Sequence, residues 1–379
     1  MLLFVIMSSV IAICCSAITI KTLVGYTSTS LFFKIIVTIL VTASWFAPVL
    51  SMSLKKAYTN VPFVINASYV LYFFFGLAFI LFALLLSRDI IWYIGYALKK
   101  LPSPKDIQLL NLTNVIVVVL SFLIASYSLY EGLRAPRLKE VEITSSKISE
   151  PFRIILLTDT HINQGTTIKQ LNNLVARVNA QNPDVILLVG DVIDDRLPVL
   201  ENKVDVLKGL KAKYGSYLSL GNHELYNGLQ SWSQKFSHMG EGFYFLNNQE
   251  QFLPLANVHL LGIPDTRVFR TYPEYTPNFD ELMVNAPETS YKIILSHAPD
   301  VAKGLPEGMF DLQVSGHTHG GQIFPFHIPA KLENKFLAGL YDERGTKVYV
   351  SRGAGYWGPP LRFLAPSEIT VIDIKPEVK

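Results

Sequence analysis

The pattern of hydrophobic and polar positions divides the chain into two different halves. Up to about residue 135, long apolar stretches follow one another, whereas from residue 152 onward short apolar runs alternate with polar, helix-like segments. Each long stretch has the length that a helix needs to cross the hydrocarbon core of a bilayer. We therefore predict a transmembrane region at residues 1–135, with four helices at about 1–20, 35–52, 63–86 and 109–130.

The predicted helices carry no charged residue near their middles. Charged side chains inside a membrane usually mark ion pathways or proton relays, so the pattern favours an anchor over a transporter. The first stretch could instead be a secretory signal, although it lacks a basic start and a small-residue exit site. Cys14 and Cys15 lie within it and, being adjacent, close no useful disulfide loop. Inert thiols in lipid and palmitoylation are the two interpretations left for them.

Basic residues in the short connecting loops indicate the orientation of such helices, because they are enriched on the cytoplasmic side. Six fall on one side, namely Lys21, Lys34, Arg88, Lys99, Lys100 and Lys105; five fall on the other, namely Lys55, Lys56, Arg134, Arg137 and Lys139. By this margin of one residue, the sequence predicts a multi-pass protein of the cell membrane whose C-terminal half is extracytoplasmic. Trp92, Tyr93 and Tyr96 are typical of an interfacial anchor in the third loop.

In the C-terminal half, five short apolar runs each end in a polar signature. FRIILL ends at TDTH, DVILLVG at DVIDD, GSYLSL at GNHE, YKIIL at SHAPD and FDLQV at SGHTH. Residues 168–181 and 199–214 carry apolar positions at helical spacing. This alternation predicts an α/β domain, and in such folds ligands bind beyond the carboxyl ends of the strands. We place the domain at residues 136–379, opening with an edge strand in RLKEVEITSSKISEP.

Charge supports the division into halves. Residues 1–135 hold nine Lys or Arg against three acids, a net charge of +6, and the remaining 24 basic and 27 acidic residues give the C-terminal half a net charge of −3. No basic run interleaved with aromatic residues occurs, so nucleic acid is not expected as a partner.

Histidine is concentrated in the polar signatures. Five of the eight histidines occur there: His161, His223, His297, His317 and His319. A single histidine or aspartate at a strand end is ordinary turn chemistry, but five histidines at the ends of apolar runs are not expected by chance. Because imidazole is the commonest metal ligand, the pattern indicates a metal site.

The signatures, taken in chain order, resemble the motifs of the calcineurin-like metallophosphoesterases. They read Asp159-Thr160-His161, Gly190-Asp191, Gly221-Asn222-His223-Glu224, His297 and Gly316-His317-Thr318-His319. The resemblance extends over about residues 138–375. The stretches GNHELY, SGHTHGGQIFP and RGAGYWGPPLRF are similar to the branch of the family in which a multi-span membrane segment precedes the catalytic domain.

The resemblance implies a β-sandwich of two mixed sheets flanked by helices, and two divalent metal ions. It assigns Asp159, His161, Asp191 and His319 to one ion, and Asp191, Asn222, His297 and His317 to the other. Two ions held by a bridging carboxylate clamp the phosphoryl oxygens and share the hydroxide that attacks phosphorus. A glycine-flanked turn would let His317 and His319 part towards different ions. Imidazole, carboxylate and amide ligands suit Mn, Fe or Zn.

The same resemblance gives two further residues a catalytic role. His223 holds no metal and protonates the leaving oxygen, while Glu224 accepts its second ring proton and so fixes its tautomer. Because the metal needs neutral imidazoles, activity is expected to fall below about pH 6.

Some residues near these motifs allow two interpretations. Arg352 and Arg362 flank GAGYWGPP, which is either a tight turn or a phosphate contact. Asp194 and Asp195 are typical of solvated turn acids. The aromatic residues expected near the mouth of the site are Tyr226, Trp232, Phe324, Phe326, Tyr356 and Trp357.

Together these features predict a membrane-anchored phosphoesterase that cleaves phosphodiester or pyrophosphate bonds. A site anchored beside a bilayer makes a lipid-linked substrate a reasonable hypothesis. The alternative is a membrane sensor or binding protein that uses the same fold in a regulatory role, and the sequence does not predict the oligomeric state.

Overall fold

The computed structural model describes residues 2–25, 27, 29–104 and 106–377, so that Met1 and Lys105 of the predictions above lie outside the described residues. The chain forms two compact units. We call residues 1–133 with 358–363 the helical unit, and residues 134–357 with 364–379 the sheet unit.

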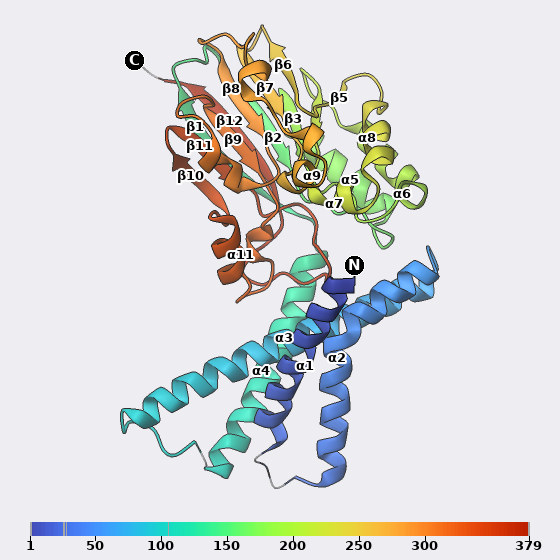
Figure 1. The fold of residues 1–379 in the computed structure, drawn as a ribbon, viewed down its shortest axis with the longest axis vertical. Helices are drawn as coiled ribbons and strands as arrows, with labels where there is room; N and C mark the ends of the chain where they lie inside the picture. Colours follow the sequence, from blue (N-terminus) through green and yellow to red (C-terminus); the bar gives the residue numbers. More distant parts are fainter. Residues whose placement is uncertain (1, 26, 28, 105, 378–379) are drawn as a thin grey trace. The chain divides into compact units, whose positions relative to one another are not determined.

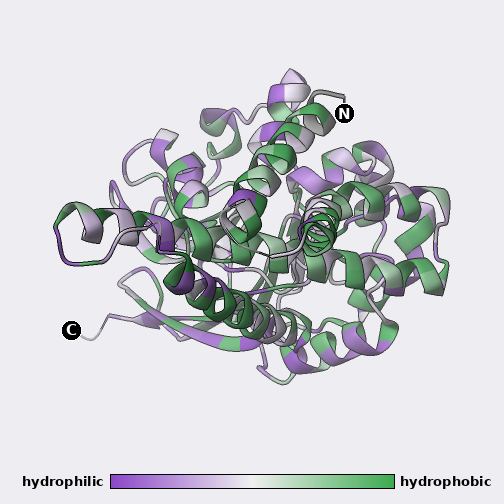
Figure 2. Cartoon of the chain, turned by 90° about the horizontal axis from the view of Figure 1, so that it is seen from below, coloured by the Kyte–Doolittle hydropathy of each residue, from purple (hydrophilic) through white to green (hydrophobic). Residues whose placement is uncertain are grey.

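The helical unit contains four helices long and apolar enough to cross a membrane: α1 (Leu2–Ile20), α2 (Leu31–Ala57), α3 (Pro62–Ala97) and α4 (Ile107–Leu133). A π-helical turn, Lys21–Gly25, continues α1. Ser30 caps α2 by accepting the N–H of Phe33, and Pro62 starts α3, where a missing N–H costs nothing. Figure 2 shows hydrophobic residues along these helices.

Helix α3 is longer than predicted. It runs for 36 residues and includes Trp92, Tyr93 and Tyr96, which were expected in a loop. The apolar run ends at Ser87, but helical hydrogen bonding continues because residues 88–94 include no glycine or proline that would stop it.

A short segment from the C-terminal half belongs to the helical unit. Residues 358–363 pack against α3 and α4: the Arg362 N–H donates to the Ser128 carbonyl at 2.9 Å, and the Phe363 ring lies 6.5 Å from that of Tyr127. Arg362 is fully buried there. This return of the chain to the helical unit was not predicted.

The sheet unit is a sandwich of two mixed six-stranded sheets, as predicted (Figure 1). The first has the order β1-β12-β2-β3-β4-β5, with β1 at Arg137–Ser145, β12 at Glu368–Pro376, β2 at Phe152–Leu157, β3 at Val185–Val189, β4 at Ser216–Ser219 and β5 at Phe243–Phe245. The second has the order β10-β11-β9-β8-β7-β6, with β10 at Gly339–Glu343, β11 at Thr346–Val350, β9 at Leu312–Ser315, β8 at Tyr291–Leu295, β7 at Val258–Gly262 and β6 at Gln249–Leu253. Strand β1 is an edge strand, as its alternating pattern predicted.

Alternation along the strands creates two cores. On β2, Ile154 and Leu156 face the second sheet, whereas Ile155 and Leu157 face the helices. The helices on that outer face are α5 (Ile168–Asn179), α6 (Leu197–Val204) and α8 (Leu229–Ser237). Helix α5 starts with a capping box between Thr167 and Gln170.

The predicted helix at 199–214 is replaced by α6 and a 3₁₀ turn, Asp205–Gly209. The remaining short helical pieces are α7 (Asn222–Tyr226), α9 (Thr266–Thr271), Pro273–Tyr275, α10 (Phe279–Leu282), Pro299–Gly304, His319–Gly321 and α11 (His327–Asn334).

The topology brings the polar signatures to one edge. Strands β2, β3 and β4 are adjacent and parallel in the first sheet, and β7, β8 and β9 are adjacent and parallel in the second. Their carboxyl ends therefore point the same way within each sheet, and each signature follows the last residue of its strand.

Candidate metal centre

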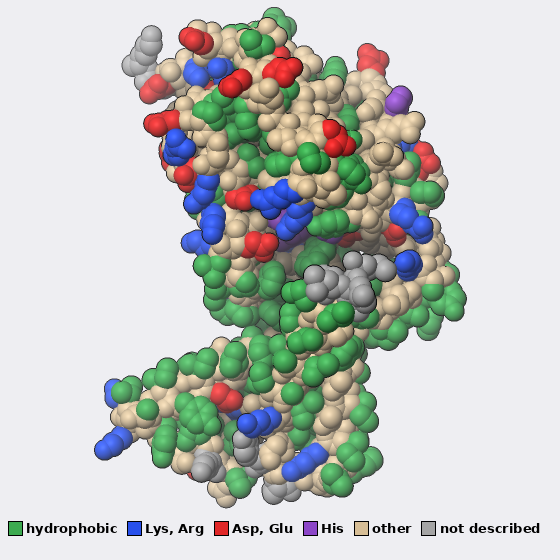
Figure 3. All heavy atoms as spheres, viewed as in Figure 1, with side chains coloured by type: hydrophobic (Ala, Val, Ile, Leu, Met, Phe, Trp, Pro, Cys, Tyr) green, Lys and Arg blue, Asp and Glu red, His purple; other side chains and the backbone are tan. Residues whose placement is uncertain are grey.

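The predicted ligand side chains lie together at this edge of the sandwich. Among the described residues, three groups of three have ligand atoms within 4.8 Å of one another: Asp159, His161 and His319; Asp191, His297 and His317; and His161, Asp194 and His223. The first two contain predicted ligands only. Figure 3 shows histidine side chains beside basic ones on the surface of the sheet unit. The structure thus separates His317 from His319 as the resemblance implied, while metal binding by these atoms stays a prediction.

In the first group, hydrogen bonding of His161 Nδ1 directs the other ring nitrogen, Nε2, at the candidate ligands His319 and Asp159. His161 Nδ1 lies 2.7 Å from Asp194 Oδ1, which fixes the proton on Nδ1. Its Nε2 faces His319 Nε2 at 2.9 Å and lies 3.9 Å from Asp159 Oδ1. Asp159 is fully buried, and burial is the main cause that raises its pKa.

In the second group, His297 is oriented in the same way. Its Nδ1 donates to the Val189 carbonyl at 2.9 Å, so that Nε2 is the ring nitrogen directed at Asp191. This Nε2 is buried, has no hydrogen-bond partner, and faces Asp191 Oδ2 at 3.1 Å. A lone pair against a carboxylate in a buried site is unfavourable unless a proton or a cation lies between them.

The surrounding charges of the second group point to a cation as well. Burial disfavours charge on His297, but Asp191 and Asp159 outweigh it and raise its pKa well above the ordinary value. Burial lowers the pKa of His317 to about 3, and His297 and Arg267 contribute to this. His317 is therefore a neutral imidazole, the form that binds metal.

Asp191 lies between the two groups. Its Oδ2 is 3.8 Å from His161 Nε2 and 3.1 Å from His297 Nε2, while its Oδ1 accepts the N–H of His223 at 2.8 Å. Although burial opposes ionisation, His297 and His223 hold the pKa of Asp191 well below its ordinary range. An anionic oxygen shared by both groups fits a bridging ligand of two divalent cations.

Left-handed backbone conformation is shared by most of these residues. Asp159, His161, Asp191, His317 and His319 have φ values of 51°, 44°, 51°, 70° and 50°. Such conformations are uncommon outside glycine and concentrate at functional sites. The ligands themselves adopt these turns, together with Gly320 and Gly321 directly after His319, whose φ values are 60° and 79°.

Two motif glycines, Gly221 and Gly316, allow close packing. A Cβ at Gly221 would collide with Asp191, and a Cβ at Gly316 would collide with the carboxylate of Asp159. Neither residue has a positive φ. Glycine is needed at both positions because the two carboxylates lie directly against the backbone.

The hydrogen-bond partner of His223 corrects a prediction. The ring Nδ1 of His223 lies 2.5 Å from Asp194 Oδ1, which also accepts from His161. Asp194, which the sequence indicated as a turn acid, therefore fixes the tautomer of His223, and the prediction that Glu224 does so is wrong. Burial lowers the pKa of His223, but Asp191 and Asp194 outweigh it and raise it to about 10.

Glu224 holds the backbone of the Asp191 turn. It is fully buried, and its two carboxylate oxygens accept the N–H groups of Asp191, Val192 and Gly221 at 3.1, 2.8 and 2.7 Å. Burial, followed by Asp191, raises its pKa to about 7, and the backbone donors oppose this shift. The Glu224 carboxylate therefore bonds backbone N–H groups and positions Asp191, a candidate ligand.

Replacing Glu224 by alanine is expected to lower stability by several kcal/mol, because each buried N–H left unpaired costs about 1–3 kcal/mol. Glutamine, which keeps one acceptor oxygen, should have a smaller effect. Thermal unfolding of the detergent-purified chain measures this, with the exposed Glu241→Gln as control. A Glu224→Gln variant of unchanged stability but greatly reduced turnover would restore the catalytic role.

The sequence analysis missed Arg267. This residue follows β7 on α9, whose first N–H groups are capped by the buried Asp265. Its Nη1 lies 2.9 Å from His317 Nε2 and 3.2 Å from Asn222 Oδ1, and its Nη2 lies 3.5 Å from Glu333. The same strand-end rule that selected the histidines applies to the VHLLGIPDTR stretch, and would have found it.

Other residues are placed as follows. Arg352 pairs with Glu368 at 2.8 Å, and Arg362 is buried in the helical unit, so a phosphate contact by Arg362 is wrong. The loop between them supports the site through its backbone, since the N–H groups of Ala354 and Gly355 donate to the carbonyls of Thr158 and Asp159. Trp232 is a core residue, whereas Tyr226, Phe324, Phe326 and Trp357 are exposed.

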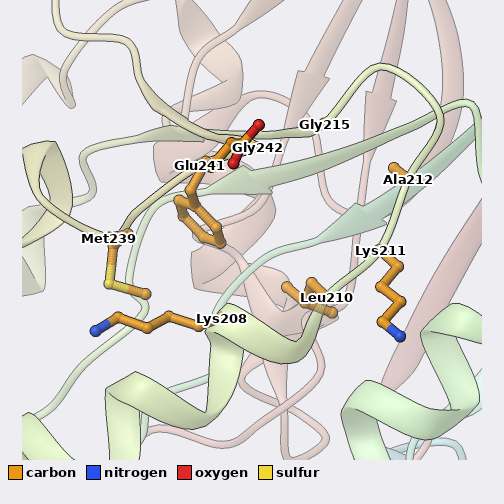
Figure 4. Close-up of a pocket in the computed structure, with 9 residues that line it drawn as sticks. Lys208, Leu210, Lys211, Ala212, Gly215, Met239, Glu241 and Gly242 are labelled. Atoms are coloured by element: carbon orange, nitrogen blue, oxygen red, sulfur yellow. The ribbon is translucent and has the colours of Figure 1, made fainter.

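A pocket of about 380 Å³ lies elsewhere in the sheet unit (Figure 4). It is lined by Lys208, Leu210, Lys211, Ala212, Gly215, Met239, Glu241, Gly242 and Phe243. None of the candidate ligands lines it, so we assign it no part in the chemistry.

Comparison with known proteins agrees with this arrangement. The family model for calcineurin-like phosphoesterases matches residues 152–321, which contain every candidate ligand. An uncharacterized metallophosphoesterase of Campylobacter jejuni is 34% identical over 310 residues, and the alignment covers 81% of each chain. The chain belongs to the calcineurin-like metallophosphoesterase family.

The metallophosphoesterase is also similar to a membrane protein. A zebrafish protein described as a transmembrane protein with metallophosphoesterase domain is 33% identical over 274 residues, covering 69% of this chain and 62% of that one. Among solved structures, a dimetal phosphatase from zebrafish aligns with 55% of this chain and 89% of its own, at 13% identity and a TM-score of 0.33. Family membership makes the protein a phosphoesterase, with clustered His and Asp side chains suited to divalent metal ions.

Proposed function

We propose that the protein is a membrane-anchored phosphodiesterase that hydrolyses phosphodiester or pyrophosphate bonds, with lipid-linked molecules as its substrates. The observation that carries the chemistry is the buried Nε2 of His297, which has no hydrogen-bond partner and faces Asp191 Oδ2 at 3.1 Å, between two His/Asp groups. Four helices suited to crossing a bilayer support the lipid-linked class of substrate.

The residues divide the work of hydrolysis as follows. Asp159, His161, Asp191 and His319 would hold one divalent ion, and Asp191, Asn222, His297 and His317 the other, with Mn, Fe or Zn as the metals. When bound, the ions supply an activated water and neutralise charge on the phosphoryl group. His223, protonated on the ring nitrogen opposite Asp194, donates its proton to the leaving oxygen.

Arg267 favours a diester. With an ion bound, Asn222 and His317 would serve as its ligands, which would leave the guanidinium N–H groups of Arg267 available to a phosphoryl oxygen. The one positive charge that Arg267 adds to the site matches the single negative charge of a phosphodiester. Glu333, paired with Arg267, keeps the guanidinium at the mouth of the site.

Substituting Arg267 by alanine is expected to reduce kcat/KM for a diester roughly 10- to 100-fold, since a charged hydrogen bond contributes about 1.5–3 kcal/mol. Inhibition by inorganic phosphate should weaken in parallel, which gives a readout that does not depend on turnover. Arg270→Ala, an exposed arginine on the same helix, is the matched control. Equal behaviour of the two variants would remove Arg267 from substrate binding.

The reaction itself is tested on the full-length protein purified in detergent with Mn. Bis(p-nitrophenyl) phosphate is expected to be hydrolysed faster than p-nitrophenyl phosphate. A higher rate on the monoester would contradict the phosphodiesterase proposal while leaving the family assignment intact.

We further propose that the sheet unit lies on the extracytoplasmic side, from the six basic loop residues against five. A reporter active on one side only, fused after the last residue, tests this. Activity of a cytoplasm-restricted reporter would reverse the orientation.

A further inference from the structure

An exposed apolar surface adjoins the candidate metal centre. It consists of Phe324, Phe326, Ile328, Leu332, Trp357 and Leu364, whose exposed fractions are 42, 48, 54, 69, 48 and 71%. We call these six residues the apolar rim. Hydrophobic side chains gather over the face that carries α11 (Figure 3). Apolar patches of this kind usually mark a surface for a partner, a ligand or a membrane.

The apolar rim is joined directly to the site. Gln322 exchanges two hydrogen bonds with the Trp357 backbone, at 2.8 and 2.9 Å, which ties the start of the α11 segment to the Trp357 loop. The Trp357 ring lies 6.5 Å from that of His223. An apolar group seated on the rim would therefore extend from the position where His223 meets the leaving oxygen.

Chain connectivity links part of the rim to the helical unit. Trp357 and Leu364 are the residues immediately before and after segment 358–363, which packs among the candidate spans α3 and α4. Within that segment, Leu361 lies against Gly76 of α3, and Arg362 is hydrogen-bonded to Ser128 of α4. Two rim residues are thus one peptide bond from a segment anchored among the spans.

The composition of α11 suits a lipid surface. Ile328 and Leu332 are four residues apart and lie on one face of the helix, whereas Ala330 is buried. Lys331 and Lys335 are exposed beside them. Apolar side chains with flanking lysines are typical of helices that lie in the membrane interface, where tryptophan is also enriched.

We propose that the apolar rim inserts into the surface of the bilayer that anchors the chain, and there seats the hydrocarbon part of an amphiphilic phosphodiester. Insertion stands on the rim itself, whereas the seating of substrate rests on the proposed function. Substrate would then reach the metal centre from the lipid surface without leaving it for water.

Insertion is tested by fluorescence on the full-length chain in nanodiscs of phosphatidylcholine and phosphatidylglycerol. In a background with Cys14 and Cys15 replaced by serine, an environment-sensitive label is attached at Leu332→Cys. Leu255→Cys, at an 88% exposed leucine between β6 and β7, is the control. We expect nitroxide-labelled lipid to quench the label at 332 and not at 255, and aqueous iodide to do the reverse. Quenching at 332 by iodide alone, or by neither agent, would overturn insertion.

Seating of substrate is tested by a ratio of rates. Leu332→Glu is expected to lower the rate on an amphiphilic phosphodiester in the nanodisc, relative to bis(p-nitrophenyl) phosphate, by about tenfold or more, as follows from losing the burial of one leucine. Leu255→Glu should leave the ratio unchanged. An unchanged ratio for Leu332→Glu would overturn seating. Absence of turnover on both substrates would instead count against the proposed function, while the quenching result remained valid.

Discussion

Replacing Asp191 by asparagine is expected to lower turnover roughly 10³-fold or more and to reduce the amount of bound metal. Asparagine keeps an oxygen that accepts the N–H of His223, but it removes the negative charge that faces His161 and His297. The two ions contribute several kcal/mol of transition-state stabilisation, and each ~1.4 kcal/mol lost is a tenfold loss in rate.

Metal analysis and kinetics on the same preparation measure this effect. The exposed Asp280→Asn provides a substitution of the same chemistry away from the site, and should match the unmodified protein. Two metal ions per chain and near-normal turnover in Asp191→Asn would falsify the bridging role.

Much of the site could be predicted because its residues directly follow the ends of strands. Asp159, Asp191 and His297 each follow a buried apolar run, and apolar runs of that length are readable as strands without a structure. Parallel neighbours deliver their carboxyl ends to one edge, so residues far apart in sequence meet there. The fold class follows from the same alternation and from the family motifs.

The partners within the site could not be predicted in this way. Asp194 and Glu224 both lie within a few residues of a candidate ligand, and sequence gave no reason to prefer Asp194 as the acceptor for His223. The choice depends on which carboxylate reaches the ring and which is turned to the backbone N–H groups of Val192 and Gly221. Side-chain direction in such turns is set by the left-handed φ of Asp191, which no local propensity predicts.

The return of residues 358–363 to the helical unit could not be predicted from the sequence either. The stretch GPPLRF reads as a turn followed by a short apolar pair. Its place depends on the fit of Leu361 against Gly76, a long-range contact for which the absence of a glycine side chain makes room. Arg362 thereby becomes a buried residue, although its charge and its proximity to the glycine-rich loop suggested a phosphate contact.

Replacing His223 by glutamine is expected to lower kcat by about 10²- to 10⁴-fold on substrates with alkoxide leaving groups, the usual contribution of general acid catalysis. The loss should be much smaller with p-nitrophenyl esters, because p-nitrophenolate leaves without a proton. Bound metal should be unchanged, since the predicted ligand sets do not include His223 and its Nδ1 is held by Asp194. This combination separates a proton donor from a ligand, because loss of a ligand would reduce metal content and would affect every substrate alike.

Asp194→Asn provides the matched test of how His223 is held. Asparagine keeps one oxygen that can accept from His161 and His223 but carries no negative charge, so both rings lose the anion that fixes their tautomers. We expect Asp194→Asn to combine a leaving-group-dependent loss with reduced metal affinity, whereas His238→Gln, at an exposed histidine, should change neither. A uniform loss in His223→Gln across all leaving groups, with metal content intact, would assign His223 to charge stabilisation at the phosphoryl group instead of proton donation. The leaving-group dependence therefore decides between the two roles that a protonated imidazole beside Asp191 can perform.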